Sequence, residues 1–117
     1  RKMNKSSLLM INISNDTWFG SSIGPYHHLE IARIRSIENN RWTIRATNDG
    51  YSAIISNKGT IVSYIEKGVS SILEGEVKLI NLVSFYNKAG YLFAYIFTFF
   101  IIALYLISLI WKKYKQS

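Results

Sequence analysis

A polar and aromatic string, SNDTWFG at Ser14–Gly20, combines the most unusual set of side chains in the chain. Asn15 and Asp16 place an amide and a carboxylate directly after an apolar run, and Trp18 and Phe19 follow them. Two large aromatic rings are costly to expose on a plain loop, and loops at strand ends often carry binding sites. Two interpretations stay open: the rings plug the core, or they form a pocket wall for an apolar group.

A serine motif follows, because GSSIG at Gly20–Gly24 matches the G-x-S-x-G pattern of a hydrolase nucleophile elbow. In that elbow fold the triad runs serine, acid, histidine along the chain. Here His27 and His28 follow the serine at once, and no histidine comes after Asp49. A helix that starts at Pro25 also leaves the turn too loose. We therefore interpret the motif as a flexible loop.

Metal and acid–base chemistry find little support. His27 and His28 are neighbours, and neighbouring side chains on a helix point about 100° apart, so one ion cannot readily use both. Glu30 and Glu38 lie beside arginines rather than as a pair of carboxylates. We expect no metal site and no cofactor, and a structural or hydrogen-bonding role for the histidines. The chain contains no cysteine, so it supplies no thiol nucleophile, disulfide or cysteine-ligated metal site.

The elements that must position these residues alternate in type. The patterns predict a helix from Pro25 to about Asn39 or Asn40. They also predict five strands, at Ser7–Ser14, Arg41–Thr47, Tyr51–Ser56, Thr60–Tyr64 and Glu74–Leu82. This order suits one section of a layered α/β sandwich, with too little core to be a complete one. The first residue is Arg1 rather than Met, which suggests a piece of something longer.

The predicted helix has an apolar face that should pack on the strands. Arg33 falls in the middle of this face, with Glu30 one turn earlier, so Arg33 is either paired internally or part of a site. The expected members of the face are Tyr26, Leu29, Ala32, Ser36 and Ile37, with Ile34 at its edge.

The C-terminal segment predicts a membrane helix. Residues 89–111 carry no charge, and Leu92–Trp111 is long enough at ~1.5 Å per residue to cross a hydrocarbon core of ~30 Å. Three lysines follow, at Lys112, Lys113 and Lys115, and such clusters stay on the cytoplasmic side. We expect residues 1–88 outside the cytoplasm, residues 89–111 in the membrane and residues 112–117 as a cytoplasmic basic tail.

The charge balance is basic but dispersed. The chain has 14 Lys plus Arg against 7 Asp plus Glu, a formal net charge of +7. No nucleic-acid motif accompanies the scattered positive residues. A mildly basic face near an anionic membrane surface explains them better, and we expect no nucleic-acid partner.

Taken together, these strings resemble a known family. They look like the C-terminal part of apolipoprotein N-acyltransferase, a membrane enzyme of the nitrilase-like (carbon-nitrogen hydrolase) superfamily. The family usually has Trp where this chain has Tyr26 and Gln where it has His27. The matching stretches are Ser14–Gly20, Ser22–His28, Ile31–Arg35 with Glu38, and Arg45–Asn48 before Gly50.

The resemblance implies an α-β-β-α sandwich followed by one transmembrane helix, and a Glu–Lys–Cys triad. The thiolate takes an acyl chain from a phospholipid as a thioester and passes it to the N-terminal diacylglyceryl-cysteine of a bacterial lipoprotein. All three triad residues precede the Ser7–Ser14 strand in the family. None maps onto this chain, so the segment alone is expected to be inactive.

The resemblance also implies a binding role for the loop. Trp18 and Phe19 would line the acyl or lipid pocket, while Asn15 and Asp16 would hold the loop or touch the polar end of the substrate. Arg33, Arg35 and Glu38 would form a structural network. The partners implied are a phospholipid donor, an apolipoprotein acceptor and the bacterial inner membrane, with a monomeric protein whose soluble part is extracytoplasmic.

Two alternatives remain. The first is a membrane-anchored nitrilase-like amidase, although free amidases of this superfamily lack a C-terminal membrane span. The second is a membrane-anchored binding domain without chemistry.

Overall fold

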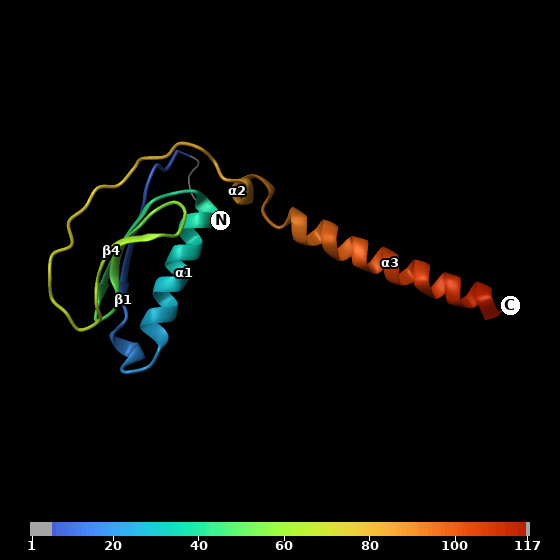
Figure 1. The fold of residues 1–117 in the computed structure, drawn as a ribbon, viewed down its shortest axis with the longest axis horizontal. Coiled ribbons are helices and arrows are strands. Elements are labelled where there is room, and N and C mark those ends of the chain that lie inside the picture. The colour runs from blue at the N-terminus through green and yellow to red at the C-terminus, as the bar shows by residue number, and fades with distance from the viewer. Residues whose placement is uncertain (1–5, 117) are drawn as a thin grey trace.

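The computed structural model describes residues 6–116, so Arg1 and the last residue of the expected basic tail lie outside the described residues. A four-stranded sheet in the order β1-β2-β3-β4 carries one helix on one face, and a long helix leaves the domain (Figure 1). The elements are β1 (Met10–Asn15), α1 (Gly24–Asn39), β2 (Thr43–Asn48), β3 (Ser52–Ile55), β4 (Ile61–Ile65), α2 (Phe85–Ala89) and α3 (Leu92–Gln116).

The connections within the sheet follow from its element order. β1 and β2 are parallel, from Met10↔Thr43 to Asn15↔Asn48, because α1 carries the chain back between them. β2, β3 and β4 are joined by short turns and pair antiparallel. The predicted helix and the first four predicted strands are confirmed as elements, and the protein is a mixed α/β fold.

The buried side of α1 is narrower than predicted. Leu29 and Ala32 pack against Ala53 and Ile55 of β3, and Ser36 is fully buried. Two predicted members of the face, Tyr26 (47%) and Ile37 (55%), are instead exposed, as is Ile34 (53%), which was predicted at its edge. The sheet beneath the helix is narrow among the described residues, so only the central stripe of α1 finds apolar partners.

Arg33 was also placed wrongly on the buried stripe, although its predicted partner is correct. Its side chain is half-exposed, and its Nη1 donates to both carboxylate oxygens of Glu30 at 2.8 and 2.9 Å. Its Nε donates to the carbonyl of Gly59 at 2.8 Å. Arg33 therefore ties α1 to the β3–β4 turn.

The predicted alternation of polar and apolar residues in β2 is confirmed, but the polar residues Thr43 and Arg45 face inward. Thr43 and Arg45 are 3% and 1% exposed, on the face that α1 covers. On β1 the same alternation turns Ile11 and Ile13 to the opposite face, where they are 69% and 82% exposed. The usual burial of the apolar side is overridden because Arg45 finds a carboxylate partner inside.

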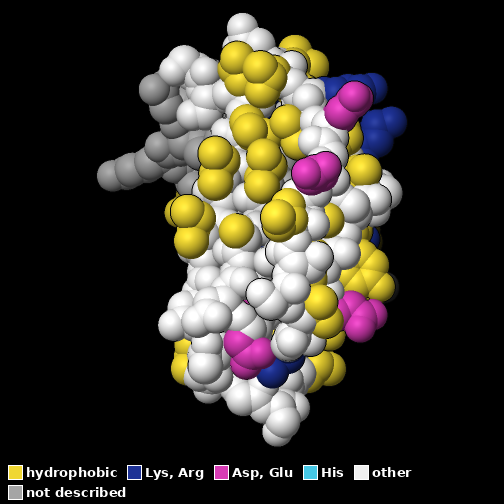
Figure 2. Space-filling view, turned by 90° about the vertical axis from the view of Figure 1, so that its left-hand side faces the viewer, with side chains coloured by type: hydrophobic (Ala, Val, Ile, Leu, Met, Phe, Trp, Pro, Cys, Tyr) yellow, Lys and Arg dark blue, Asp and Glu magenta, His cyan; other side chains and the backbone are white. Residues whose placement is uncertain are grey.

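The predicted strand at Glu74–Leu82 is wrong. Residues 66–84 cross the sheet face opposite α1 without joining a ladder, and Ile80 N donates to Leu8 O at 3.2 Å as the segment returns. Gly75 lies so close to Ile54 that an added Cβ would come within 2.7 Å of its side chain. Figure 2 shows hydrophobic side chains gathered over the upper part of this side of the molecule.

The apolar C-terminal segment forms one long helix, α3, as the sequence predicts. The segment Leu92–Lys112, 21 residues with mean hydropathy 2.5, is long and apolar enough to cross a membrane, and none of its most apolar window is buried. The helix continues to Gln116, through most of the predicted tail. A short helix that the sequence did not predict, α2, precedes it.

Candidate functional site

The predicted site loop begins where the parallel pair of strands ends. β1 ends at Asn15 beside Asn48 of β2, and the chain then makes one 3-10 turn over Thr17–Phe19 before α1 begins at Gly24. The carboxyl ends of parallel strands are where α/β proteins commonly bind ligands. The loop is therefore held by two strands and one helix.

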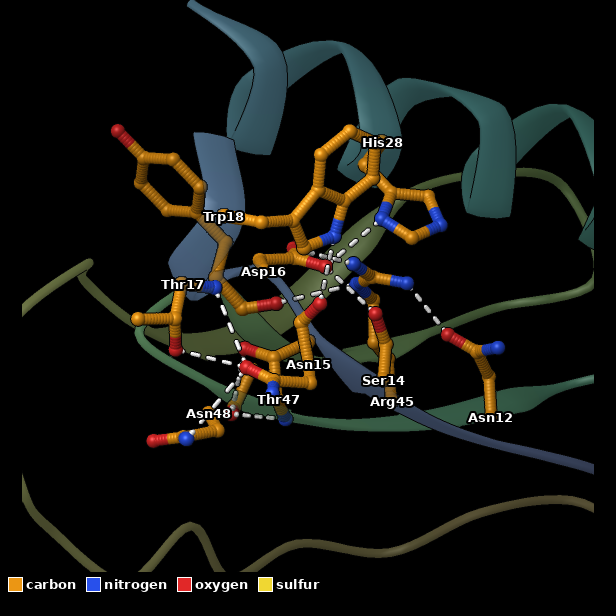
Figure 3. Close-up of polar contacts among 12 residues, drawn as sticks. Asn12, Ser14, Asn15, Asp16, Thr17, Trp18, His28, Arg45, Thr47 and Asn48 are labelled. Atoms are coloured by element: carbon orange, nitrogen blue, oxygen red, sulfur yellow. Dashed lines mark hydrogen bonds and ion pairs between the residues drawn. The ribbon is translucent and has the colours of Figure 1, made fainter. Parts of the chain in front are cut away.

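Asp16 lies beneath this loop and is fully buried. Its Oδ2 accepts a hydrogen bond from Arg45 Nη2 at 2.8 Å, and its Oδ1 lies 2.8 Å from His28 Nδ1. Figure 3 shows the carboxylate between His28 of α1 and Arg45 of β2. One side chain thus joins the loop to a helix and to the neighbouring strand.

Arg45 is equally buried, and its guanidinium is shared among several acceptors. Its Nη1 donates to the side-chain oxygen of Asn12 on β1, and its Nε donates to Tyr51 O at 3.3 Å. An unpaired buried charge costs several kcal/mol, on the order of 3–5 when one partner is removed. The buried pair therefore requires both of its members.

The electrostatics of Asp16 favour its charged form. Burial would raise the pKa of this carboxyl, but hydrogen bonds from Ser14 and His28 and the positive charge of Arg45 outweigh it, so the pKa lies below its ordinary value. Asp16 is an anion that accepts hydrogen bonds and not a proton donor. It is too enclosed to touch a substrate, so of its two predicted roles the structure supports holding the loop.

Gly50 makes the room that Asp16 needs. A Cβ on Gly50 would lie 2.4 Å from Asp16 Oδ2 and 2.9 Å from its Cβ, closer than atoms can approach. This explains a glycine after Asn48 and Asp49 where the sequence pattern indicated only a turn.

Asn15 organises the start of the turn. Its side-chain oxygen accepts hydrogen bonds from Thr17 N at 3.2 Å and Thr17 Oγ1 at 2.7 Å, and Asn48 Nδ2 approaches it at 3.5 Å. An Asn side chain that bonds two residues ahead imitates a backbone turn. Asn15 is exposed, so it remains free to contact a ligand as well.

Trp18 and Phe19 stack on each other at the tip of the loop, with ring centroids 4.0 Å apart. Trp18 is 76% exposed, and its Nε1 donates to Asn15 O at 3.0 Å. Phe19 is half-buried, since Gly24 leaves space for its ring and His28 meets it edge-on at 6.0 Å. The interpretation that Trp18 plugs the core is therefore wrong.

A cavity of about 460 Å³ lies between β1 and α1. Arg45 and His28 contribute polar groups to it, and Ile31 and Met10 contribute apolar surface. Neither this cavity nor a second one of about 320 Å³ beside Asn48 is lined by Asn15, Trp18 or Phe19. The aromatic pair thus stands at the surface rather than inside a closed pocket of the described chain.

The other candidates are structural. Ser22 Oγ accepts a hydrogen bond from Gly24 N at 3.2 Å, as in a loop that leads into a helix. His28 is the hydrogen-bonding histidine that the sequence predicted. Arg35 and Glu38 pair at 2.7 Å. Within residues 6–116, no group of three or more His, Cys, Asp or Glu could hold a metal ion.

Comparison with known proteins relates the chain to one family. The carbon-nitrogen hydrolase family model matches residues 3–85. The chain is 49% identical over 71 residues to an apolipoprotein N-acyltransferase of Pseudomonas paraeruginosa. The aligned stretch covers 61% of this chain and 14% of that protein. A Pseudomonas putida protein of the same name is 51% identical over 69 residues, covering 59% and 14%.

A more distant relative extends the match. An apolipoprotein N-acyltransferase of Geobacter metallireducens is 40% identical over 89 residues, covering 76% of this chain and 17% of that protein. The chain thus spans about one seventh of the length of the curated relatives it matches, 14% for the Pseudomonas proteins. Since the family model covers most of the chain, this protein belongs to the carbon-nitrogen hydrolase family.

Proposed function

We propose that this chain is the C-terminal part of an apolipoprotein N-acyltransferase and contributes one side of its acyl-binding site. The observation that carries the proposal is the Asn15–Phe19 loop, which displays Trp18 on a base made rigid by the buried Asp16–Arg45 pair. Relatives at 40–51% identity that bear this name support it.

The proposed reaction has two transfers. A thiolate attacks the ester carbonyl of a phospholipid, forming a thioester and releasing a lysophospholipid. The free α-amino group of a lipoprotein's N-terminal diacylglyceryl-cysteine then attacks the thioester, forming the amide and returning the thiol. A carboxylate moves the protons and an ammonium group stabilises the oxyanion. The thiol must come from outside this chain, because the chain contains no cysteine. The chain by itself is therefore inactive.

Each loop residue has a distinct proposed role. Trp18 and Phe19 form the apolar wall along which the acyl chain lies. Asn15 contacts the polar end of the substrate, because its side chain is exposed and already oriented by Thr17. Asp16 positions the loop from beneath and touches no substrate.

The proposed setting is the bacterial inner membrane. Residues 1–88 form the extracytoplasmic domain portion, residues 89–111 lead into and cross the bilayer, and residues 112–117 lie in the cytoplasm. The donor phospholipid and the lipoprotein acceptor are both membrane-bound, so a site attached to a membrane helix meets both. The protein acts as a monomer.

The test is the variant Trp18→Ala in the full-length membrane protein. We expect acyl transfer to fall at least ~10-fold, equivalent to about 1.4 kcal/mol of transition-state stabilisation. Because the ring is 76% exposed, folding should lose less than ~1 kcal/mol. Tyr64→Ala removes a 53% exposed aromatic from β4 and serves as the matched control, with activity unchanged.

Equal losses of activity and stability in Trp18→Ala would contradict the proposed role of the ring. Hydrolysis of simple amides without acyl transfer to a lipopeptide would support the amidase alternative instead. Tight lipopeptide binding with neither reaction would favour the binding domain.

A further inference from the structure

The outer surface of α1, on the side away from the sheet, carries exposed isoleucines. Ile23, which precedes the helix, is 65% exposed, and Ile34 and Ile37 are 53% and 55% exposed. Ile34 lies opposite the buried stripe of Leu29 and Ala32, and Ile37 lies on the flank of the helix beside Gly59 of the β3–β4 turn. α1 therefore exposes apolar side chains on the side that the sheet does not cover.

The charged side chains of α1 leave no net charge on this surface, because they form ion pairs with one another. Glu30 and Arg33 form one ion pair, and Arg35 and Glu38 form another, each three residues apart along the helix. The charged side chains of α1 are therefore neutralised within the helix. Paired charges cost less to move out of bulk water than free ones, because each already has its counter-charge.

The C-terminal end of α1 is anchored to the start of the membrane helix. Ser84 donates a hydrogen bond to the carbonyl of Glu38, and Asn87 Nδ2 donates to Asn39 Oδ1 at 3.2 Å. α3 begins at Leu92, soon after α2 ends at Ala89. The point where the chain enters the apolar span is thus held beside the last turn of α1.

Figure 1 shows α1 on the side of the sheet from which α3 extends. α1 covers the sheet face turned toward α3, while residues 66–84 run along the opposite face. The long axis of α1 runs across the direction of α3, so the helix presents its side and not its end toward the span. The loop tip with Trp18 lies at the other end of the same helix.

We propose that the outer surface of α1, defined by Ile23, Ile34 and Ile37, rests on the lipid bilayer that α3 spans. The helix then lies in the head-group region as an interfacial helix does. Trp18, an aromatic side chain of the type that favours this region, is held at the lipid surface. The proposal rests on the membrane span of the proposed function and does not depend on acyl transfer.

The test is spin labelling of single introduced cysteines in the full-length protein, reconstituted into phosphatidylethanolamine–phosphatidylglycerol vesicles. This chain has no cysteine of its own, and unsubstituted protein treated with the label supplies the background. Ile34→Cys and Ile23→Cys probe the two ends of the surface, and Leu104→Cys in α3 reports the bilayer itself. Ser71→Cys is the matched control, since Ser71 is exposed in the segment of residues 66–84 that runs on the side turned away from α1.

We expect labels at positions 34, 23 and 104 to be relaxed by oxygen several-fold more, relative to a water-soluble nickel chelate, than the label at position 71. A lipid signature at 104 with nickel-accessible labels at 34 and 23 would overturn the proposal and leave the span intact. Labels at 34 and 23 shielded from both reagents would overturn it in favour of a covering protein segment. No lipid signature at 104 would refute the span and this proposal together, whatever the acyl-transfer assay shows.

Discussion

At the scale of single residues, the site depends on one buried ion pair. Asp16 directly follows β1, Arg45 lies on β2, and they are 0% and 1% exposed. Burying both charges costs desolvation energy, which their hydrogen bonds offset only while both partners are present. The pair therefore specifies where the loop sits more than it adds net stability.

Asp16→Asn should reveal this dependence. Removing the anion leaves Arg45 charged and enclosed, so we expect the free energy of unfolding to fall by about 3–5 kcal/mol. Asp49→Asn is the matched control, because the Asp49–Lys67 pair is at 3.2 Å and about a third exposed, and should cost no more than ~1 kcal/mol. Urea unfolding of the detergent-solubilised protein measures both. Similar losses in the two variants would show that Asp16 is not a buried charge.

The same carboxyl predicts loss of stability in acid. Its pKa is lower in the folded protein than the ~3.9 of an unfolded Asp, so its charge stabilises the fold above that value. As pH falls below about 4 and through the folded pKa, this contribution is lost. We expect the urea midpoint to drop steeply there in the unsubstituted protein and in Asp49→Asn, and less in Asp16→Asn. An equal slope in all three would assign the acid sensitivity to other groups.

At the scale of elements, β1, the loop and α1 act as one unit whose geometry depends on a close approach. The first residue of α1, Gly24, lies against the ring of Phe19, and an added Cβ would be 2.1 Å from its Cδ1. Phe19 in turn supports Trp18 by stacking. The position of the exposed ring is therefore set by the start of the helix.

Gly24→Ala tests that coupling, because the change in the free energy of unfolding has opposite signs with and without the clash. Without the clash, alanine in a helix would stabilise it by up to ~1 kcal/mol relative to glycine. With the clash, Phe19 must move, and we expect a loss of ~1–3 kcal/mol together with reduced acyl transfer. Ser22→Ala, which removes only the hydroxyl bonded to Gly24 N, should cost less than ~1.5 kcal/mol. A stabilised and fully active Gly24→Ala protein would disprove the coupling.

At the scale of the whole molecule, the prediction concerns α3, the helix that is long and apolar enough to cross a membrane. If the span runs from Leu92 to Lys112 with its lysine-rich end in the cytoplasm, a thiol at Ser71 is extracytoplasmic and one at Lys115 is not. A membrane-impermeant thiol reagent should label Ser71→Cys in intact spheroplasts and Lys115→Cys only after permeabilisation. The reverse pattern would invert the proposed topology.

Local patterns in the sequence were sufficient for most elements. Pro25 and the apolar period located α1, alternation and turn residues located β2 to β4, and the uncharged stretch located α3. These signals act between near neighbours, so they survive without knowledge of the fold. The Asn15–Phe19 loop stands out as a candidate site from its residue types alone, and its binding role stays a prediction.

Only the tertiary structure decided which faces are inside. Arg45 alternates like a solvent-facing residue, and nothing near it in sequence shows that its partners are Asn12 on β1 and Asp16 directly after it. Glu74–Leu82 has a strand pattern but no strand beside it among the described residues. The sequence by itself determined most of the elements, the family and an apolar C-terminal helix. Long-range pairing determined the buried charge network and the apolar outer surface of α1, because both depend on partners far away in the chain.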